Sequence, residues 1–377
     1  MDLPWNRSTS IQPASNSSDV VYVNADEVTI SGLNITGSSS SSITEIHLNG
    51  VKHCRIENNQ LSGNYIGNVP NTFGGNNSST VNNSSSSIGF GILLDLSSSN
   101  TLSNNTLSDN KVTILLRNSS QNTLVSNTAS NSSCGIWMNS SSNNTLNGNN
   151  VSDNKVGVYL EVSNGNTLNN STVLNNTASG INLRNSSENI LKNSFVSSNK
   201  VSIVLQNSSR NLLNNNKVSD STYGIRVYSF SNNNELTDNR VSNNKFGIHL
   251  SNSIENTLTG NTVFNCARSG INLLDSTGNI LNGNRIVMNS EYGLYLLNSG
   301  YSSIYNSYLI HKNNAYSGGA NKGTSLNINK AVGTNILVGF YPGGNFWAAP
   351  WEKSSINQEW IDKEGIYDEA YILSQRL

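Results

Sequence analysis

Charged residues are scarce in this sequence. Lys, Arg, Asp and Glu make up 12% of the 377 residues, and the formal net charge is -1. There is no long run of Lys or Arg, so the composition argues against nucleic acid or an anionic membrane surface as the main partner. Hydrophobic residues make up 35% of the chain, which is enough for a sizeable core if they recur periodically.

Cysteine and long apolar runs are also scarce. Cys54, Cys134 and Cys266 are far apart and lack metal-type spacing, so we expect small buried residues and neither disulfides nor a metal site. No apolar run approaches the roughly 18 residues of a membrane helix. The start "MDLPWNRSTS" lacks the basic region and apolar stretch of a signal peptide, which taken alone favours the cytoplasm.

Asn and Ser are abundant instead. Many N-x-S/T triplets result, and they begin among other places at Asn6, Asn16, Asn34, Asn77, Asn118, Asn131, Asn185 and Asn207. A polar, weakly charged chain with such triplets is typical of secreted or envelope glycoproteins. We therefore expect an extracytoplasmic location, at the cell surface or secreted, with no signal peptide in the given chain.

A tandem repeat organises the apolar residues. Segments of the type "GIxL" begin at residues 91, 113, 135, 157, 180, 202, 224, 247, 270 and 293, at intervals of 22 or 23 residues. The I-x-L pair has the period of two expected of a strand that turns one face inward, and no segment has helical spacing. A leucine-rich repeat has a similar period, but its L-x-x-L-x-L spacing is absent.

The repeat predicts an all-β fold, a right-handed single-stranded parallel β-helix of about 12–13 coils with 22–23-residue repeats. We expect an N-terminal cap or linker over 1–27, the β-helix over 28–312 with a polar loop insertion at 64–87, and an aromatic-rich C-terminal cap over 313–377. The cap carries Trp347, Trp351 and Trp360. Asp362, Glu364 and Asp368 alternate as in a calcium loop but lack its full ligand set, so calcium is at most a weak candidate and no other cofactor is expected.

Asn recurs in two columns along the repeats. One holds Asn100, Asn122, Asn144, Asn166, Asn189, Asn211, Asn234, Asn256 and Asn279, and the other holds Asn105, Asn127, Asn149, Asn216, Asn239, Asn261 and Asn284. Stacking of coils places each amide above the next, so we expect hydrogen-bonded ladders at the corners of the coils.

The spacing "N-T-L…N-x-V…G-I-x-L" resembles the NosD-type or carbohydrate-binding and sugar-hydrolase (CASH) β-helix repeats of archaeal and bacterial cell-surface proteins. The C-terminal "GGNFWAAPW" and the Asp- and Gly-containing stretch after it look like the segment that often closes such repeats. The resemblance implies the fold over about residues 28–377. It leaves the activity open, because the family includes maturation factors, surface proteins, epimerases and hydrolases.

If Ile and Leu of "GIxL" point inward, the x position and the residue after Leu point outward. We predict that Trp137 and Tyr159 are exposed there. Aromatic rings beside charged groups suit sugar binding, so the hypothesis is a polysaccharide or cell-envelope glycan site. Its residues are Trp137, Tyr159, Glu161, Arg184, Asp95, Arg117, Arg226 and His249. The alternative is that Asp95–Arg117 and Glu161–Arg184 are ordinary ion pairs between coils, and that Trp137 supports the 64–87 loop or a partner subunit.

Catalytic residues are not evident. The acids Asp109, Asp153, Asp220, Asp238, Glu255, Asp275 and Glu291 are scattered among predicted corners, where single acids usually cap turns. His47, His53, His249 and His311 do not form a metal site. The sequence thus favours a cell-surface or secreted scaffold that binds polysaccharide over an enzyme. A polysaccharide lyase, epimerase or hydrolase is the first alternative, and an accessory factor in maturation of an extracytoplasmic metalloenzyme is the second.

Overall fold

Every regular element in the described part of the protein is a β-strand. The computed structural model describes residues 10–11, 19–36, 44–63, 89–311, 313–326 and 345–348. Within them, no helix is present that has the length and apolarity to cross a membrane. The chain divides into unit 1, Met1–Asn189, and unit 2, Ile190–Leu377, and each unit is described separately.

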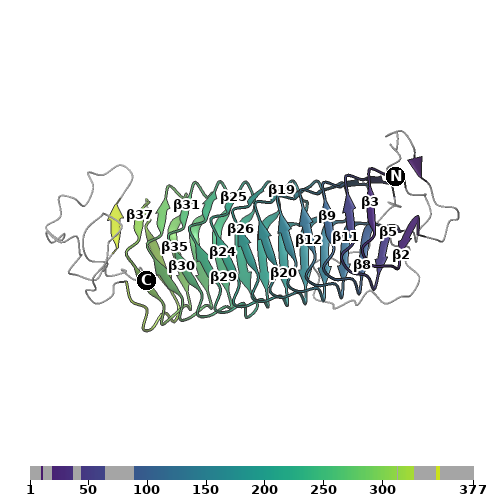
Figure 1. Cartoon of the computed structure of the whole chain (residues 1–377). Coiled ribbons are helices and arrows are strands. Elements are labelled where there is room, and N and C mark those ends of the chain that lie inside the picture. The colour runs from purple at the N-terminus through teal and green to yellow at the C-terminus, as the bar shows by residue number, and fades with distance from the viewer. Residues whose placement is uncertain are drawn as a thin grey trace. The chain divides into compact units, whose positions relative to one another are not determined.

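Each coil of unit 1 contributes strands to three parallel sheets, called B, C and A in the order in which the chain meets them (Figure 1). Sheet B contains β2 (Val21–Val23), β5 (Thr44–Asn49), β8 (Phe90–Asp95), β11 (Val112–Arg117), β14 (Cys134–Asn139), β17 (Val156–Glu161) and β20 (Ser179–Arg184). Sheet C contains β3 (Thr29–Ser31), β6 (Arg55–Glu57), β9 (Thr101–Ser103), β12 (Thr123–Val125), β15 (Thr145–Asn147) and β18 (Thr167–Asn169). Sheet A contains β1 (Ser10–Ile11), β4 (Asn34–Thr36), β7 (Gln60–Ser62), β10 (Thr106–Ser108), β13 (Thr128–Ser130), β16 (Asn150–Ser152) and β19 (Thr172–Leu174).

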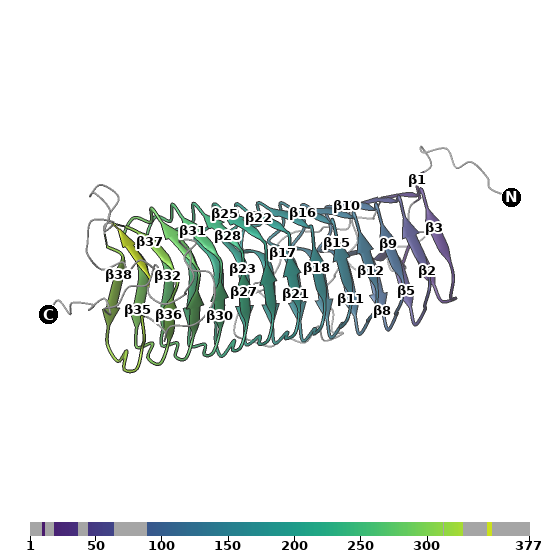
Figure 2. The same ribbon diagram turned by 60° about the vertical axis from the view of Figure 1, so that its left-hand side comes forward.

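Unit 2 repeats this arrangement (Figure 2). Its sheet B contains β23 (Val201–Gln206), β26 (Tyr223–Tyr228), β29 (Phe246–Ser251), β32 (Ser269–Leu274), β35 (Tyr292–Leu297) and β38 (Ala315–Gly318). Sheet C contains β21 (Ile190–Lys192), β24 (Leu212–Asn214), β27 (Glu235–Thr237), β30 (Thr257–Thr259), β33 (Ile280–Asn282) and β36 (Ser303–Tyr305). Sheet A contains β22 (Phe195–Ser197), β25 (Lys217–Ser219), β28 (Arg240–Ser242), β31 (Thr262–Phe264), β34 (Arg285–Val287), β37 (Tyr308–Ile310) and β39 (Phe346–Ala348).

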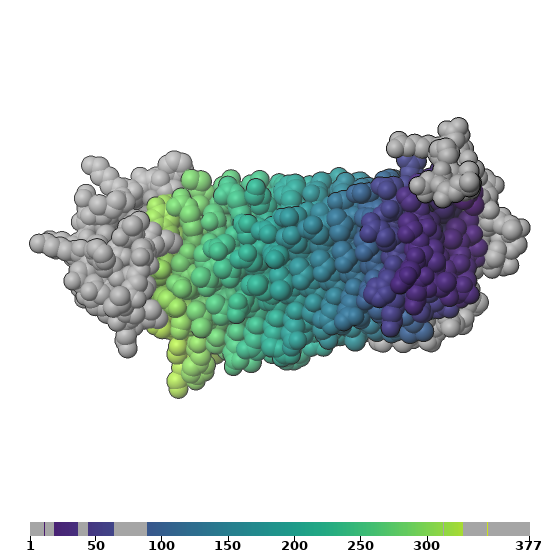
Figure 3. Space-filling model, viewed as in Figure 1, coloured from purple at the N-terminus to yellow at the C-terminus, as the bar shows by residue number. Residues whose placement is uncertain are grey.

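The register of the strands confirms the predicted repeat. Ile114 of β11 pairs with Ile136 of β14, 22 residues later, and Val158 of β17 pairs with Ile181 of β20, 23 residues later. The fold is a parallel β-solenoid of about 12 turns. The right-handed sense of winding remains a prediction from the crossover rule. Neighbouring coils within each unit are in contact along the face drawn in Figure 3.

The interior of the coils holds the periodic apolar residues. Ile114 and Leu116 from sheet B, Leu124 from sheet C and Ala129 from sheet A are fully buried. Cys54, Cys134 and Cys266 are buried and free, as predicted. This core explains the apolar spacing within each repeat, because each short strand turns one side chain inward.

The Gly that precedes the inward Ile in "GIxL" lies where the core leaves no room for a Cβ atom. A Cβ on Gly135 would lie 2.5 Å from Cγ1 of Val151, which sits on sheet A sixteen residues later. Thr113 occupies the equivalent position in the preceding coil and is buried, and the residue sixteen later is the smaller Ala129. The space across the core therefore accounts for Gly at position 135 and allows the larger Thr at position 113.

The predicted Asn ladders are present and buried. Oδ1 of Asn122 accepts hydrogen bonds from both the backbone N–H of Asn100, at 2.9 Å, and its Nδ2, at 3.2 Å. Oδ1 of Asn127 does the same for Asn105, at 3.0 and 2.9 Å. The ladders thus satisfy backbone donors at the bends in addition to joining side-chain amides.

Two further corner ladders were not predicted. One consists of Ser, which is common throughout the sequence, and the residue type varies from coil to coil in the other. In one, the N–H of Ser97 donates to Oγ of Ser119, whose own N–H donates to Oγ of Ser141. In the other, the N–H of Cys266 donates to Oδ1 of Asn289, and the N–H of Asn289 donates to Nδ1 of His311 at 3.1 Å. Cys266 and His311 are therefore corner residues of the fold.

Left-handed backbone marks the remaining corner positions. The acids that sequence analysis placed at corners have positive φ there: Asp109, Asp153, Asp220, Asp238, Glu255 and Asp275. Asn and Asp tolerate this conformation best, which explains much of the polar composition. The turn interpretation of these acids is confirmed, and Glu291 instead lies 3.5 Å from Arg268.

The domain boundaries remain predictions. Strands β1 and β2 pair with β4 and β5 although they lie within 1–27, and β38 and β39 pair with β35 and β37 although they lie within 313–377. The 64–87 insertion, Trp351, Trp360 and the calcium-like residues Asp362, Glu364 and Asp368 lie outside the described residues, as does the side chain of Trp347.

Candidate functional site

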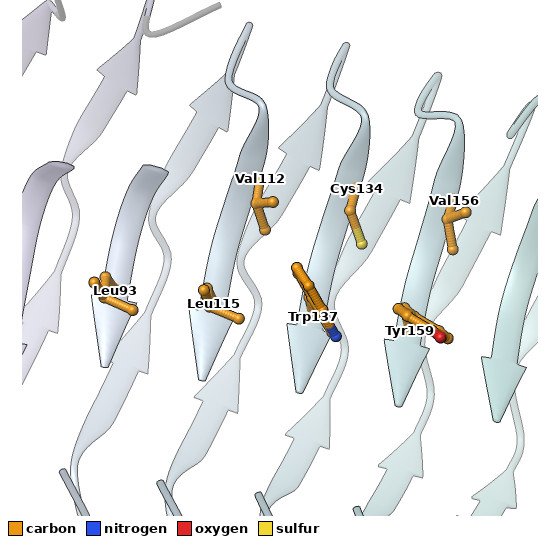
Figure 4. Close-up of a cluster of buried hydrophobic side chains, with 7 residues drawn as sticks. All are labelled: Leu93, Val112, Leu115, Cys134, Trp137, Val156 and Tyr159. Carbon is orange, nitrogen blue, oxygen red and sulfur yellow. The ribbon is translucent and has the colours of Figure 1, made fainter. Parts of the chain in front are cut away.

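The outer side of sheet B in unit 1 carries six of the eight predicted glycan-binding residues. The prediction that Trp137 and Tyr159 are exposed is wrong, since the two residues are 6% and 3% exposed. Their rings stack with centroids 5.9 Å apart. They share a buried cluster with Leu93, Leu115, Val112, Cys134 and Val156, in two rows across β8, β11, β14 and β17 (Figure 4).

Strand alternation gives the direction of a side chain but not its exposure. Ile136 and Met138 point into the coil and are fully buried, so Trp137 between them points out. Trp137 is buried nonetheless, in a cluster with a second apolar row that includes Val112 and Val156. That second row was readable in the sequence and would have indicated a second core.

The charged residues of unit 1 form ion pairs between coils, as the alternative interpretation predicted. Nε and Nη2 of Arg117 donate to the two carboxylate oxygens of Asp95 at 2.9 and 2.6 Å. Nη1 of Arg184 lies 3.9 Å from Oε1 of Glu161. The hydrogen bond to Asp95 raises the pKa of Arg117 above its usual value. Both arginines of this face therefore have carboxylate partners.

Burial shifts the pKa values of both Glu161 and Tyr159. Burial raises the pKa of Glu161, against the opposing effects of Arg184 and of the hydrogen bond from Tyr159. Burial, together with the charge of Glu161, raises the pKa of Tyr159, so its hydroxyl stays protonated. Asp95 and Glu161 lie three coils apart, on the order of 15 Å, which exceeds the roughly 5–10 Å between the two carboxyls of a glycoside hydrolase.

The outer side of sheet B in unit 2 is different in kind. Arg226 on β26 is partly exposed, and its Cζ lies 5.0 Å from the ring centroid of Tyr223 and 4.4 Å from that of Tyr228. Tyr223 stacks on Phe246 of β29, with centroids 5.0 Å apart and ring planes at 17°. Both rings are partly exposed, in contrast to Trp137 and Tyr159.

His249 and Asn272 continue the column that begins at Arg226. Burial, with a contribution from the charge of Arg226, lowers the pKa of His249 to about 4, so its imidazole is neutral at pH 7. Nδ2 of Asn272 lies 3.4 Å from Nδ1 of His249. Oδ1 of Asn272 is buried and has no hydrogen-bond partner among the described residues.

A second aromatic group lies on β35 and β38. Tyr295 and Tyr316 stack with centroids 4.7 Å apart, and Tyr292 packs 5.7 and 5.5 Å from them. Tyr316 is 38% exposed. Between this group and Phe246, β32 presents the short side chains Ser269 and Asn272. Sequence analysis chose Arg226 and His249 on this face and left out Tyr295, which lies at the x position like them. It did not consider the outward column three residues before x, which holds Tyr223, Phe246 and Tyr292.

Comparison with known proteins identifies the family of this chain. The family model described as periplasmic copper-binding protein (NosD) matches residues 6–145, 71–216 and 198–351. The chain belongs to the NosD family. No curated protein matches this NosD family member.

Several solved structures are similar to this NosD family member at low sequence identity. A periplasmic alginate epimerase AlgG has 14% identity and a TM-score of 0.47, over 84% of this chain and 76% of that one. The A-module of the Azotobacter vinelandii mannuronan C-5 epimerase AlgE6 has 14% identity and a TM-score of 0.48, over 78% and 82%. The catalytic domain of a GH87 alpha-1,3-glucanase, in complex with tetrasaccharides, has 13% identity and a TM-score of 0.50, over 86% and 67%.

The described residues do not fit the copper site that the NosD description names. Within them, no three His, Cys, Asp or Glu side chains come together where a metal ion would bind. Nδ1 of His47 bonds to Asp19 at 2.7 Å, and Nδ1 of His311 accepts from the corner backbone. Burial raises the pKa of Cys134 and of Cys266, the latter to about 12, so these thiols stay protonated.

Proposed function

We propose that this NosD family protein is an extracytoplasmic β-solenoid scaffold that binds polysaccharide on the outer side of sheet B in unit 2. The binding surface comprises Tyr223, Arg226, Phe246, Tyr292, Tyr295 and Tyr316, which lie around the buried His249 and Asn272, and is called the unit 2 face. The observation that carries the proposal is the row of partly exposed rings on β26, β29, β35 and β38 beside the partly exposed guanidinium of Arg226, which has no hydrogen-bond partner among the described residues.

The chemistry of the unit 2 face suits a sugar chain. Tyrosine hydroxyls donate and accept hydrogen bonds, and aromatic side chains offer apolar surface to the C–H groups of a sugar. His249 and Asn272, which are 8% and 3% exposed, form a polar floor between the rings. At about 4.8 Å per coil, the span from β26 to β38 is on the order of 20 Å, which accommodates several sugar rings. A rigid scaffold supplies these groups already arranged, so less ordering entropy is lost on binding.

The extracytoplasmic location rests on the description of the family. The family model is that of a periplasmic copper-binding protein. Polysaccharides of the cell envelope are the glycans such a protein meets. For this chain, location and ligand remain parts of the proposal.

Affinity electrophoresis through gels that contain soluble polysaccharides tests the proposal. We expect retardation by at least one acidic or neutral polysaccharide, and loss of most of it in the double variant Phe246→Ala, Tyr292→Ala. The matched control is Phe195→Ala, which removes a 42% exposed ring from sheet A of the same unit. If both variants are retarded as strongly as the parent and their circular dichroism is unchanged, the unit 2 face is not the binding surface.

A further inference from the structure

We infer that the polysaccharide bound on the unit 2 face is anionic, and that Arg226 binds its acidic groups. This inference rests on the proposed function and names the class of its ligand. Its starting point is the contrast between Arg226 and the arginines of unit 1. Arg117 and Arg184 each face a carboxylate in the neighbouring coil, whereas Arg226 has no ion-pair or hydrogen-bond partner among the described residues.

The surroundings hold Arg226 in place but leave its hydrogen-bonding groups unused. Tyr223 and Tyr228 contact the guanidinium by their rings, at 5.0 and 4.4 Å from its Cζ. Nε is buried without a partner among the described residues. A buried donor of a charged group that stays unpaired is costly. The rest of the guanidinium is partly exposed and has no hydrogen-bond partner among the described residues, so an anion from outside would add charge-assisted hydrogen bonds there.

The groups beside Arg226 leave its charge uncompensated. In its column the neighbours are Val204 and the neutral His249. Beside them, Nζ of Lys245 lies 5.7 Å and Cζ of Arg268 lies 6.0 Å from the ring centroid of Phe246. Arg268 has Glu291 at 3.5 Å, on a side chain that is itself about half exposed. The area around the Tyr223–Phe246 stack is therefore positive.

The distribution of charge over the chain agrees with this reading. The described residues of unit 1 include six Lys or Arg and ten Asp or Glu, and those of unit 2 include ten Lys or Arg and six Asp or Glu. The net charge of -1 for the whole chain conceals this difference. Total charge therefore says nothing against an acidic ligand for unit 2.

The small number of cations beside the aromatic groups favours a glycan over nucleic acid. Single-stranded nucleic acid is bound by ring faces that stack on bases and by many cations along the backbone. Here three cations, Arg226, Lys245 and Arg268, lie beside the Tyr223–Phe246 stack. Ring edges carry partial positive charge and suit an anion. A guanidinium fork pairs with a carboxylate in bidentate fashion, which fits a uronate residue.

The test compares anionic polymers with neutral and nucleic-acid controls. The probes for affinity electrophoresis and titration calorimetry are polygalacturonate, alginate, their carboxyl-reduced forms, dextran, dextran sulfate and single-stranded DNA. We expect the protein to bind at least one acidic polymer. If that polymer carries carboxylates, its carboxyl-reduced form should bind at least tenfold more weakly. If it is dextran sulfate, uncharged dextran should bind at least tenfold more weakly. We expect weaker binding at high salt. Binding of dextran sulfate assigns the site to anionic groups in general, and binding of the carboxylated polymers alone assigns it to uronates.

The decisive variants are Arg226→Gln and Arg240→Gln. Arg240 is the matched control, because it lies over the ring of Phe264 at 4.3 Å on sheet A of the same unit. We expect at least a tenfold loss of affinity for Arg226→Gln, less than a twofold change for Arg240→Gln, and an intermediate loss for Arg226→Lys, which keeps the charge without the fork. Urea midpoints of the variants establish that each is folded.

The possible failures are distinguishable. Equal effects of Arg226→Gln and Arg240→Gln, equal affinity for carboxylated and carboxyl-reduced polymers, or tighter binding of DNA than of any polysaccharide would overturn this inference. Binding of neutral polysaccharides alone also overturns it but leaves the proposed function standing. Absence of binding to every polysaccharide overturns both.

Discussion

The outer side of sheet B shows two different uses of one repeat. In unit 1 its outward residues form a second hydrophobic core, with Trp137 and Tyr159 inside it and each arginine paired with an acid. In unit 2 this side carries partly exposed rings and Arg226, which has no acidic partner among the described residues, around the buried His249 and Asn272. The inward residues are alike in both units. The repeat thus determines the coil, and the outward positions are free to serve packing in one unit and recognition in the other.

The largest expected effect is a loss of stability when the buried cluster of unit 1 is disrupted. Trp137→Ala removes a large side chain from the buried cluster of unit 1 and should lower the free energy of unfolding by about 3–5 kcal/mol. Tyr316→Ala is the control in unit 2, where the side chain is 38% exposed, and should cost less than about 1 kcal/mol. Urea unfolding followed by circular dichroism measures both. Similar losses for the two variants would contradict the difference in burial.

The sequence predicted the coils well because core positions depend on local periodicity. Ile114 and Leu116 are buried as their I-x-L spacing required, and the register placed Asp95 against Arg117. Exposure of Trp137 was mispredicted because it depends on what covers a sheet, which period-two alternation does not report. The contact of Arg226 with Tyr223 and Tyr228 was missed for a related reason. It joins side chains from different columns of one strand, so its geometry requires side-chain positions.

The two buried histidines of unit 2 should make the stability of the protein depend on pH. Burial lowers the pKa of both His249 and His311 to about 4 in the folded protein, against about 6.5 when unfolded. The unfolded chain therefore binds more protons between these values, so stability is complete above pH 6.5 and falls as the pH drops towards 4. Each His accounts for at most roughly 3 kcal/mol of this loss.

His311→Asn isolates one of these contributions. Asn occupies most positions of the corner ladder in which Nδ1 of His311 accepts from the N–H of Asn289. The variant should keep most of its stability at pH 7 and lose less than the parent between pH 6.5 and 4. Urea midpoints across this range provide the measurement. Parallel pH profiles of variant and parent would show that His311 is protonated equally in the folded and unfolded states.

The arginines provide a smaller contrast. Arg117→Ala breaks a two-point pair and leaves the carboxylate of Asp95, 17% exposed, without its partner, so we expect a loss of about 1–2 kcal/mol. Arg226→Ala removes no ion pair and should change stability by less than about 0.5 kcal/mol. A double-mutant cycle with Asp95→Asn should recover most of the Arg117 effect as coupling. A larger loss for Arg226→Ala than for Arg117→Ala would mean that Arg226 serves the fold, which would weaken its assignment to a ligand.

The smallest expected effect on stability concerns the left-handed residue that follows each strand of sheet B. In unit 1 the left-handed position after Asp95 and Glu161 holds Leu96 and Val162, at φ 49° and 51°, whereas in unit 2 the same corner is mostly polar, as at Asn252. A β-branched residue is strained in this conformation, and Val162 is 51% exposed, so its packing offers little compensation. Val162→Asn should therefore stabilise the protein by about 0.5–1 kcal/mol.

The reverse substitution completes this test, because Asn118 occupies the corner between those two in sequence, at φ 48°. Asn118→Val should cost about 1 kcal/mol or less, measured by the shift in urea midpoint at unchanged slope. If Val162→Asn destabilises the protein instead, the exposed Val162 makes a contribution that outweighs its backbone strain. The apolar character of unit 1 would then extend past the edge of sheet B to the corner itself, and the two units would differ along their corners as well as on their faces.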